Sequence, residues 1–179
     1  MSNEEIEKRV LRAQELFKQG FNCSQSVFAA CADLYGIEDE ALALRLAASF
    51  GGGIGRMRLT CGAACGMFLL AGLENGSATA GDAEGKKRNY ELVQRLAAEF
   101  KAQHGSLTCA ELLGLTSAAN PTPLHPYSST PSERTEEYYR KRPCVEMVGN
   151  AVRIYLTAQR SFSESGPTGV AGLTAKRSK

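Results

Sequence analysis

The sequence predicts an all-α fold, a compact multi-helix bundle with a proline-rich insert and a disordered C-terminal tail. Apolar residues recur at helical spacing through most of the chain, glycine and proline separate the periodic segments, and few stretches alternate as strands do. The length of 179 residues and a hydrophobic content of 43% suit one domain with a full core. We therefore expect a helical domain over residues 1–160 and a tail over 161–179.

Two capping motifs predict the helices nearest the N-terminus. Ser2 with Glu5, and Asn22 with Gln25, match the pattern in which an N-cap side chain and the third helical residue exchange hydrogen bonds. Apolar residues follow each motif at helical spacing until a glycine interrupts them. These two helices are expected over residues 3–19 and 23–35.

Glycine and threonine mark the next boundaries. An alanine-rich helix follows, and we expect Leu42, Leu46 and Phe50 to be buried on it. The stretch 51–55 is too rich in glycine to continue this helix. Thr60 is the expected N-cap of the next one. The expected ranges of these helices are 40–50 and 61–70.

The second half of the chain combines helices with an irregular insert. One long helix is expected to bury a face that includes Tyr90, Leu96 and Phe100, and Thr108 is the expected N-cap of a short one. Four prolines then interrupt the pattern. The expected ranges are helices over 83–104, 109–113 and 144–159, with the insert over 115–142 and a helical turn around 133–140.

Composition excludes several classes of function. The net charge of +2 gives no field that would favour nucleic acid or a membrane surface. The longest apolar run, residues 67–73, is far shorter than the roughly 18 residues that span a bilayer. The polar N-terminus shows no secretory signal, so we expect a cytoplasmic protein. In a reducing compartment its six cysteines should be metal-binding, redox-active or simply buried.

Four of the six cysteines share one position. Cys23, Cys61 and Cys109 each follow a residue suited to N-capping, and Cys144 follows a proline, so all four are expected in the first turn of a helix. Free backbone N–H groups and the helix dipole favour thiolate over thiol there. Thiolate is the form that binds metal or attacks a disulfide. Packing by itself gives no reason for four cysteines to occupy helix starts.

The remaining two cysteines are expected inside helices. Cys31 falls near an apolar face, and Cys65 precedes an apolar run, so packing is the favoured interpretation of both. Cys65 is also an alternative ligand. Small residues after Cys61, beginning with Gly62, and the loop glycines Gly52 and Gly53 allow a backbone to approach a bound group closely. A phosphate-binding loop is poorly supported, because no strand precedes these glycines.

Five stretches of the sequence carry a resemblance to a known family. Residues 21–25, 50–55, 61–66 and 109–114, together with Cys144, resemble the C_GCAxxG_C_C family of redox-active proteins, in the family's order. The resemblance implies a small helical bacterial or archaeal redox protein of anaerobic metabolism, a module that also occurs beside haem domains in some cytochromes. It implies an iron–sulfur cluster bound by four cysteines. These are Cys23, Cys61, Cys109 and Cys144.

The sequence departs from the family pattern in two places. The family name puts cysteine between glycine and alanine, whereas this chain reads Cys61-Gly62-Ala63-Ala64-Cys65. The proline-rich insert before Cys144 is the second departure. Gly52, Gly53 and Gly62 are the expected cofactor-facing glycines.

The leading hypothesis is therefore a redox protein that binds an iron–sulfur cluster and transfers electrons to an unidentified redox partner protein. A thiol–disulfide oxidoreductase that uses two of the cysteines is the enzymatic alternative. A structural zinc site with four cysteine ligands and a helical interaction domain without metal are two further alternatives. Whether the protein is an enzyme, and whether it forms a homodimer, stays open at this point.

Other residues are weaker candidates. Arg56 and Arg58 are expected either to balance the charge of the cluster or to face water, and at least one of them should be solvated. His104 and His125 are scattered, so neither is expected to be a ligand. The basic and aromatic stretch 138–142 is expected to form a solvated face, with partner docking as the alternative.

Overall fold

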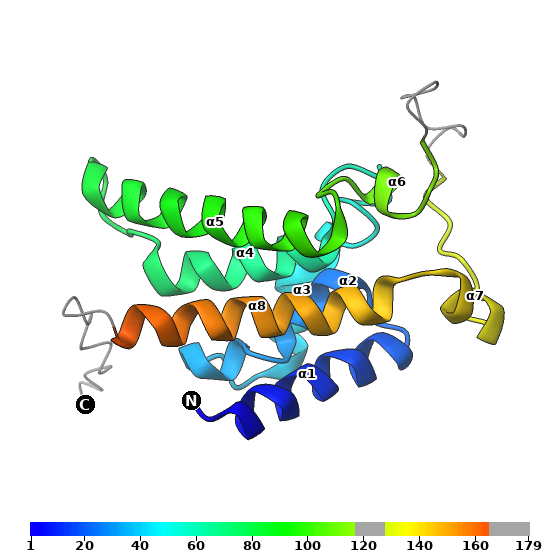
Figure 1. Ribbon diagram of the computed structural model, residues 1–179, viewed down its shortest axis with the longest axis horizontal. Coiled ribbons are helices and arrows are strands. Elements are labelled where there is room, and N and C mark those ends of the chain that lie inside the picture. Colours follow the sequence, from blue (N-terminus) through cyan, green and yellow to red (C-terminus); the bar gives the residue numbers. More distant parts are fainter. Residues whose placement is uncertain (117–127, 165–179) are drawn as a thin grey trace.

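The computed structural model describes residues 1–116 and 128–164, and within these residues the chain is all-α, as predicted. Helix α8 crosses the middle of the molecule, with α4 and α5 on one side of it and α1 on the other, while α2 packs on α4, α3, α1 and α8 (Figure 1). The helices are α1 (Asn3–Lys18), α2 (Cys23–Ala29), α3 (Glu40–Ala47), α4 (Gly62–Asn75), α5 (Ala83–His104), α6 (Cys109–Leu112), α7 (Glu136–Lys141) and α8 (Cys144–Glu164).

The capping motifs read from the sequence are present in the structure. The Ser2 hydroxyl accepts from the Glu5 N–H and the Glu5 carboxylate accepts from the Ser2 N–H, and Asn22 and Gln25 repeat this exchange before α2. Each exchange satisfies two backbone donors that a helix start would otherwise leave free. The starts of α1 and α2 are therefore fixed by local sequence.

Helix α2 is shorter than predicted. A single helix over residues 23–35 is wrong, because α2 ends at Ala29 and a separate 3₁₀ turn, η1, covers Ala32–Tyr35. Cys31, between them, has a φ of −133°, outside the helical range. The Ala30 carbonyl accepts a hydrogen bond of 2.8 Å from Arg9 Nη1, so a partner from α1 satisfies the end of α2.

Helix α3 buries a different face from the one predicted. Its buried residues are Ala43 and Ala47, whereas Leu42 and Leu46 are 40% and 49% exposed and Phe50 is half-buried in the 3₁₀ turn η2 (Ala48–Phe50). The small alanines let α3 lie close on α2. Apolar spacing alone did not distinguish the leucine face from the alanine face.

Three smaller corrections concern the other helices. Tyr90 is 60% exposed and Leu92 occupies the buried face of α5 in its place. Helix α4 continues five residues beyond the predicted end, to Asn75. Residues 161–164, predicted as tail, continue α8, and the rest of the predicted tail, 165–179, lies outside the described residues. In the described part of the chain no helix has both the length and the apolar character that crossing a bilayer requires.

Candidate functional site

Four helices begin at the same end of the bundle. The starts of α2, α4, α6 and α8 lie at the end where α6 and α7 are labelled in Figure 1. Cys23, Cys109 and Cys144 are the first residues of α2, α6 and α8, and Cys61 is the N-cap of α4. The prediction that these four cysteines stand in the first turn of a helix is correct for three of them, and Cys61 stands one position earlier at the start of α4. The N-cap of α4 is Cys61 rather than Thr60.

A short backbone pairing holds two of these cysteines side by side. Thr60 and Thr108 form an isolated antiparallel bridge. The Cys61 N–H donates to the Leu107 carbonyl at 2.7 Å, and the Cys109 N–H donates to the Leu59 carbonyl at 2.6 Å. The two threonines predicted as N-caps therefore pair segments that lie about fifty positions apart. No pattern in the sequence predicts this pairing, because one bridge is too short to show strand periodicity.

The thiols of Cys23 and Cys144 are neighbours, and each shifts the pKa of the other. They share a hydrogen bond that raises the pKa of Cys23 well above its usual value and lowers the pKa of Cys144. Burial raises the pKa of Cys23 further. Arg142, Arg134 and Arg58 assist in lowering the pKa of Cys144, because each favours a negative charge on its sulfur.

Cys61 and Cys109 complete the group. The pKa of Cys23 is also raised by the proximity of Cys61 and Cys109, and the pKa of Cys61 is raised by Cys109 and Cys144. Burial is the largest cause for Cys61, whose pKa is raised to about 12, and the N–H groups of Ala63 and Ala64 act against it. The four predicted cysteines thus influence one another electrostatically at one place in the fold.

Arginine side chains surround this group of thiols. Arg58 Nη1 lies 3.9 Å from Cys109 Sγ and donates to it. Arg134 stacks on the rings of Phe17 and Tyr138, at 4.5 and 4.8 Å from their centroids, and donates to the Phe21 carbonyl. Arg56 and Arg58, expected either to balance charge or to face water, are both partly exposed, and Arg58 also donates to Cys109 Sγ. The sequence analysis did not identify Arg134, because no residue near it in the chain indicates that it lies beside Phe17 and Phe21.

Two of the three predicted glycines contact the cysteines. A Cβ atom on Gly53 would lie 2.6 Å from Cys109 Cβ, and one on Gly62 would lie 3.2 Å from Cys23 Cβ. Gly52 instead faces Arg56, whose Cγ would be 2.9 Å from the added atom. Gly53 has a φ of +75°, so both its conformation and its neighbours favour glycine. Gly53 and Gly62 therefore let the backbone approach the cysteines closely.

The other cysteines and histidines take separate positions. Cys65 lies at the edge of the group, where burial raises its pKa to about 11 and Cys109 adds to the effect, while its thiol donates to the Thr60 carbonyl at 3.8 Å. Cys31 is buried beside Arg9, Asp33 and Arg12, away from the four. His104 packs on Phe100 at the end of α5, and His125 lies outside the described residues.

The donor chemistry of the four cysteines suits a soft metal. Among residues 1–116 and 128–164, no group of three or more His, Cys, Asp or Glu side chains is arranged as a ready metal site. The four cysteines nevertheless supply thiolate sulfur, the ligand that iron–sulfur clusters and zinc prefer. The nearby arginines and the N–H groups at the start of α4 favour negative charge on sulfur. The same arrangement suits a reactive pair of thiols.

The described residues and this site define a small all-α protein with a group of buried and partly buried thiols at helix starts. The chain belongs to the C_GCAxxG_C_C family, because the sequence model of that family, described as "Putative redox-active protein (C_GCAxxG_C_C)", matches residues 21–158. The resemblance stated from the sequence is confirmed, and with it a redox role in general terms. No curated protein and no solved structure matches the chain.

Proposed function

We propose that the protein transfers electrons through an iron–sulfur cluster ligated by Cys23, Cys61, Cys109 and Cys144. The observation that supports this most is the gathering of four thiols from four separate helix starts, each influencing the pKa of others in the group. A disulfide pair would need only two of them. The Cys61 sulfur faces the N–H groups of Ala63 and Ala64, and such donors stabilise thiolate charge and tune cluster potential.

The residues around the thiols have distinct roles in this proposal. A bound cluster would supply one-electron transfer at this end of the bundle. Arg58, which donates to Cys109 Sγ, offsets negative charge on the sulfur. Gly53 and Gly62 leave space for the cysteines, because any side chain there would displace Cys109 or Cys23. Burial of Cys61 and Cys109 limits the access of water to these two sulfurs and strengthens the electrostatic effects on them.

Anaerobic purification followed by analysis of iron and acid-labile sulfide tests the cluster. We expect coloured protein whose iron and sulfide are lost in Cys23→Ser, Cys61→Ser, Cys109→Ser and Cys144→Ser. The matched control is Cys31→Ser, which changes a buried cysteine outside the group and should keep both. Cys65→Ser tests whether the fifth thiol is a ligand. Iron-free protein with all thiols reduced, or zinc without redox activity, would contradict the proposal.

A second candidate function rests on the contact between Cys23 and Cys144. Their shared hydrogen bond places two thiols where a disulfide could form, and the lowered pKa of Cys144 makes it the nucleophile. Cys144 thiolate would attack a partner disulfide, and Cys23 would then resolve the mixed disulfide. Both partner sulfurs leave as thiols, and the protein keeps a Cys23–Cys144 disulfide. Mass analysis of metal-free protein after oxidation should show this linkage, absent in Cys144→Ser.

A further inference from the structure

The arginines near the thiols have no carboxylate partners. The ion pairs within residues 1–116 and 128–164 involve Lys8, Arg9, Arg12, Lys141 and Arg153, and none of them includes Arg56, Arg58 or Arg142. Residues 117–127 and 165–179 contain no Asp or Glu, so they bring no side-chain carboxylate to these arginines either. Arg56, Arg58 and Arg142 therefore form no ion pair with an Asp or Glu side chain in the described part of this chain.

Three arginines are held near the thiols by separate partners. Arg58 donates to Cys109 Sγ, Arg142 lies over the Tyr138 ring at 4.6 Å, and Arg56 Nη1 donates to Ser132 Oγ at 3.4 Å. The pKa of Arg56 is lowered by burial and by the like charges of Arg58 and Arg142. The Nε atom of Arg56 is buried without a hydrogen-bond partner. These three guanidinium groups therefore repel one another rather than pair with acidic groups.

Apolar side chains alternate with the arginines on the same loop. Met57 is 38% exposed and Leu59 is 47% exposed, while Arg56 and Arg58 between and beside them are half-buried. Arg56 and Arg58 have φ values of +64° and +59°, an uncommon conformation for such residues. In this conformation the Arg58 side chain reaches Cys109 and donates to its sulfur. Exposed methionine and leucine beside arginine are typical of protein interfaces rather than of sites for small anions.

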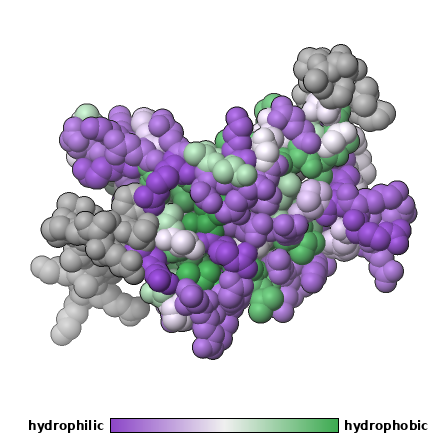
Figure 2. All heavy atoms as spheres, in the orientation of Figure 1, coloured by the Kyte–Doolittle hydropathy of each residue, from purple (hydrophilic) through white to green (hydrophobic). Residues whose placement is uncertain are grey.

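The loop 56–59 and helix α7 form one end of the molecule. They lie on the same side as the starts of α6 and α8 in Figure 1, and Figure 2 shows hydrophobic atoms next to the hydrophilic atoms of α7 at that end. Ser132, which precedes α7, contacts Arg56, and Tyr138 of α7 lies beneath Arg142. We call this surface the arginine face. Arg58 donates to Cys109 Sγ, and Arg142 favours negative charge on Cys144, so a protein docked on this face approaches the thiols.

We propose that the arginine face is the docking surface for a redox partner protein that carries acidic residues around its own redox centre. The inference rests on the proposed function, in that the thiol group is taken as the redox centre. Complementary charge steers such a partner to this face and raises the rate of encounter. Contact through Met57 and Leu59 then excludes water between the two centres. The partner supplies carboxylates to Arg56 and Arg142, neither of which forms an ion pair in the described residues.

Small probes of opposite charge test the electrostatic field at the arginine face. Metal-free protein is treated with the anionic disulfide dithiobis(nitrobenzoate) or with cationic cystamine, and reduced holoprotein is treated with anionic ferricyanide or cationic hexaammineruthenium(III). Because the probes of a pair differ in intrinsic reactivity, the readout is the ratio of the anionic rate to the cationic rate at different salt concentrations. We expect this ratio to fall about tenfold from low to high salt, because salt screens the field. A ratio that stays constant or rises with salt would overturn the proposal.

Matched variants locate the field on the molecule. Arg56→Gln with Arg142→Gln removes two charges from the arginine face, and Lys86→Gln with Lys87→Gln removes two exposed charges from the start of α5, at the opposite end of the bundle (Figure 1). The first pair should reduce the anion preference about tenfold, and the control pair should change it by less than about twofold. Equal effects of the two pairs would show that the probes respond only to the net charge of the protein, and would contradict a local docking face.

A polymer distinguishes a protein partner from a small anion. Soluble polyglutamate presents many carboxylates on one chain, as an acidic partner does, and should slow both anionic probes with wild-type protein but not with the Arg56→Gln/Arg142→Gln variant. Saturable inhibition by sulfate at constant ionic strength, without inhibition by polyglutamate, would replace the docking face with a small-anion site. Protein that binds no cluster contradicts the proposed function, yet the disulfide probes still report on the arginine face.

Discussion

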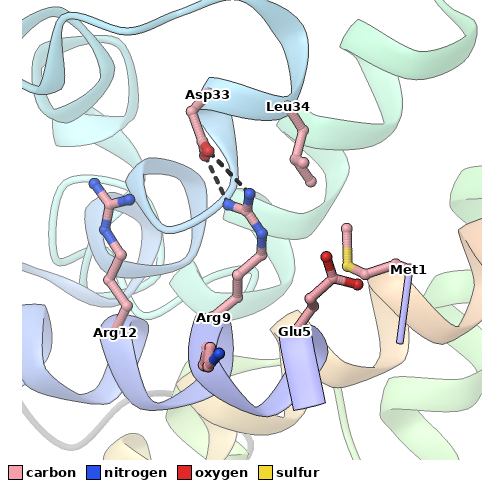
Figure 3. Close-up of a pocket in the computed structure, with 7 residues that line it drawn as sticks. Met1, Glu5, Arg9, Arg12, Asp33 and Leu34 are labelled. Carbon is pink, nitrogen blue, oxygen red and sulfur yellow. Dashed lines mark hydrogen bonds and ion pairs between the residues drawn. The ribbon is translucent and has the colours of Figure 1, made fainter. Parts of the chain in front are cut away.

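Two regions of the molecule use arginine and cysteine in opposite ways. At the corner between α1 and η1, Arg9 donates to both carboxylate oxygens of Asp33, at 2.7 and 2.9 Å (Figure 3). Arg12 pairs with Glu40 of α3. Arg9, Arg12 and Asp33 line a pocket of about 320 Å³. At the arginine face, Arg56, Arg58 and Arg142 form no ion pair within residues 1–116 and 128–164. The first region neutralises its own charge, and the second leaves charge for an outside group.

The cysteines repeat this contrast. Burial raises the pKa of Cys31, at the corner, to about 12, so its thiol stays neutral. The pKa of Cys144, beside the arginine face, is lowered by its hydrogen bond with Cys23 and by the nearby arginines. The cysteine thiol therefore stays protonated in the first region and ionises more readily in the second. The contrast indicates that satisfied groups stabilise the fold, and unsatisfied groups mark the place of function.

The largest expected effect is a difference in protein stability between alanine substitutions at two glycines, Gly53 and Gly36, which share a φ of +75°. Gly53→Ala should destabilise the protein by about 3 kcal/mol, because the new Cβ is strained and also meets Cys109. Gly36→Ala, at the corner, should cost about 1 kcal/mol, since nothing lies within 4 Å of its added Cβ. Urea unfolding measures both. Equal costs would show that close packing at Gly53 is unimportant.

A second comparison removes one arginine from each region. Arg9→Ala should destabilise the protein by about 2 kcal/mol, because it leaves Asp33 and the Ala30 carbonyl without their donor. Arg56→Ala should change stability by less than about 0.5 kcal/mol, since it relieves repulsion from Arg58 and Arg142. Thermal and chemical unfolding test the pair. A large loss of stability in Arg56→Ala would remove the distinction between the two regions.

The third prediction concerns alkaline pH. Because the folded pKa of Cys31 is raised to about 12, the unfolded chain loses this proton near pH 8.5 while the folded chain keeps it. Its contribution to stability is complete below about pH 8.5 and is lost as pH rises toward 12, by up to about 1.4 kcal/mol per pH unit. Cys31→Ala should therefore show a flatter decline than wild type in unfolding series over this range. Parallel declines would place Cys31 in contact with water.

The smallest expected effect is at acid pH. Hydrogen bonding from Arg9 lowers the folded pKa of Asp33, so its contribution is present above the unfolded pKa of about 3.9 and is lost as pH falls through the lower folded pKa. Asp33→Asn should cost about 1 kcal/mol at neutral pH, since the pair is partly exposed. The difference from wild type should shrink near pH 3. A constant difference would show that packing, rather than charge, holds Arg9 to Asp33.

Most helix boundaries followed from local signals, and most errors came from packing between helices. Capping boxes at Ser2 and Asn22 and the glycine after α5 act within one turn, so the sequence reveals them directly. The break after Ala29 depends on Arg9, which lies twenty positions earlier in the chain. The choice of the alanine face of α3 depends on how closely α2 approaches. Such causes are invisible to periodicity.

The candidate site also combines features that local sequence predicts with features that depend on contacts between distant segments. The positions of Cys23, Cys109 and Cys144 in their helices were predicted from capping and proline, and the family resemblance identified the same cysteines with Cys61. Their meeting at one end of the bundle was a hypothesis until the helices were placed. The bridge between Thr60 and Thr108, and the stacking of Arg134 on Phe17, join distant segments and carry no local signal.

The sequence by itself determined that this chain is helical, where most helices start, and that four cysteines stand at those starts, because capping and helical periodicity act over a few residues. Only the tertiary structure decided that the four starts meet, that Cys144 contacts Cys23, and that three arginines gather without carboxylates. The physical reason is distance along the chain. Electrostatic and packing energies depend on separation in space, which the order of residues does not reveal.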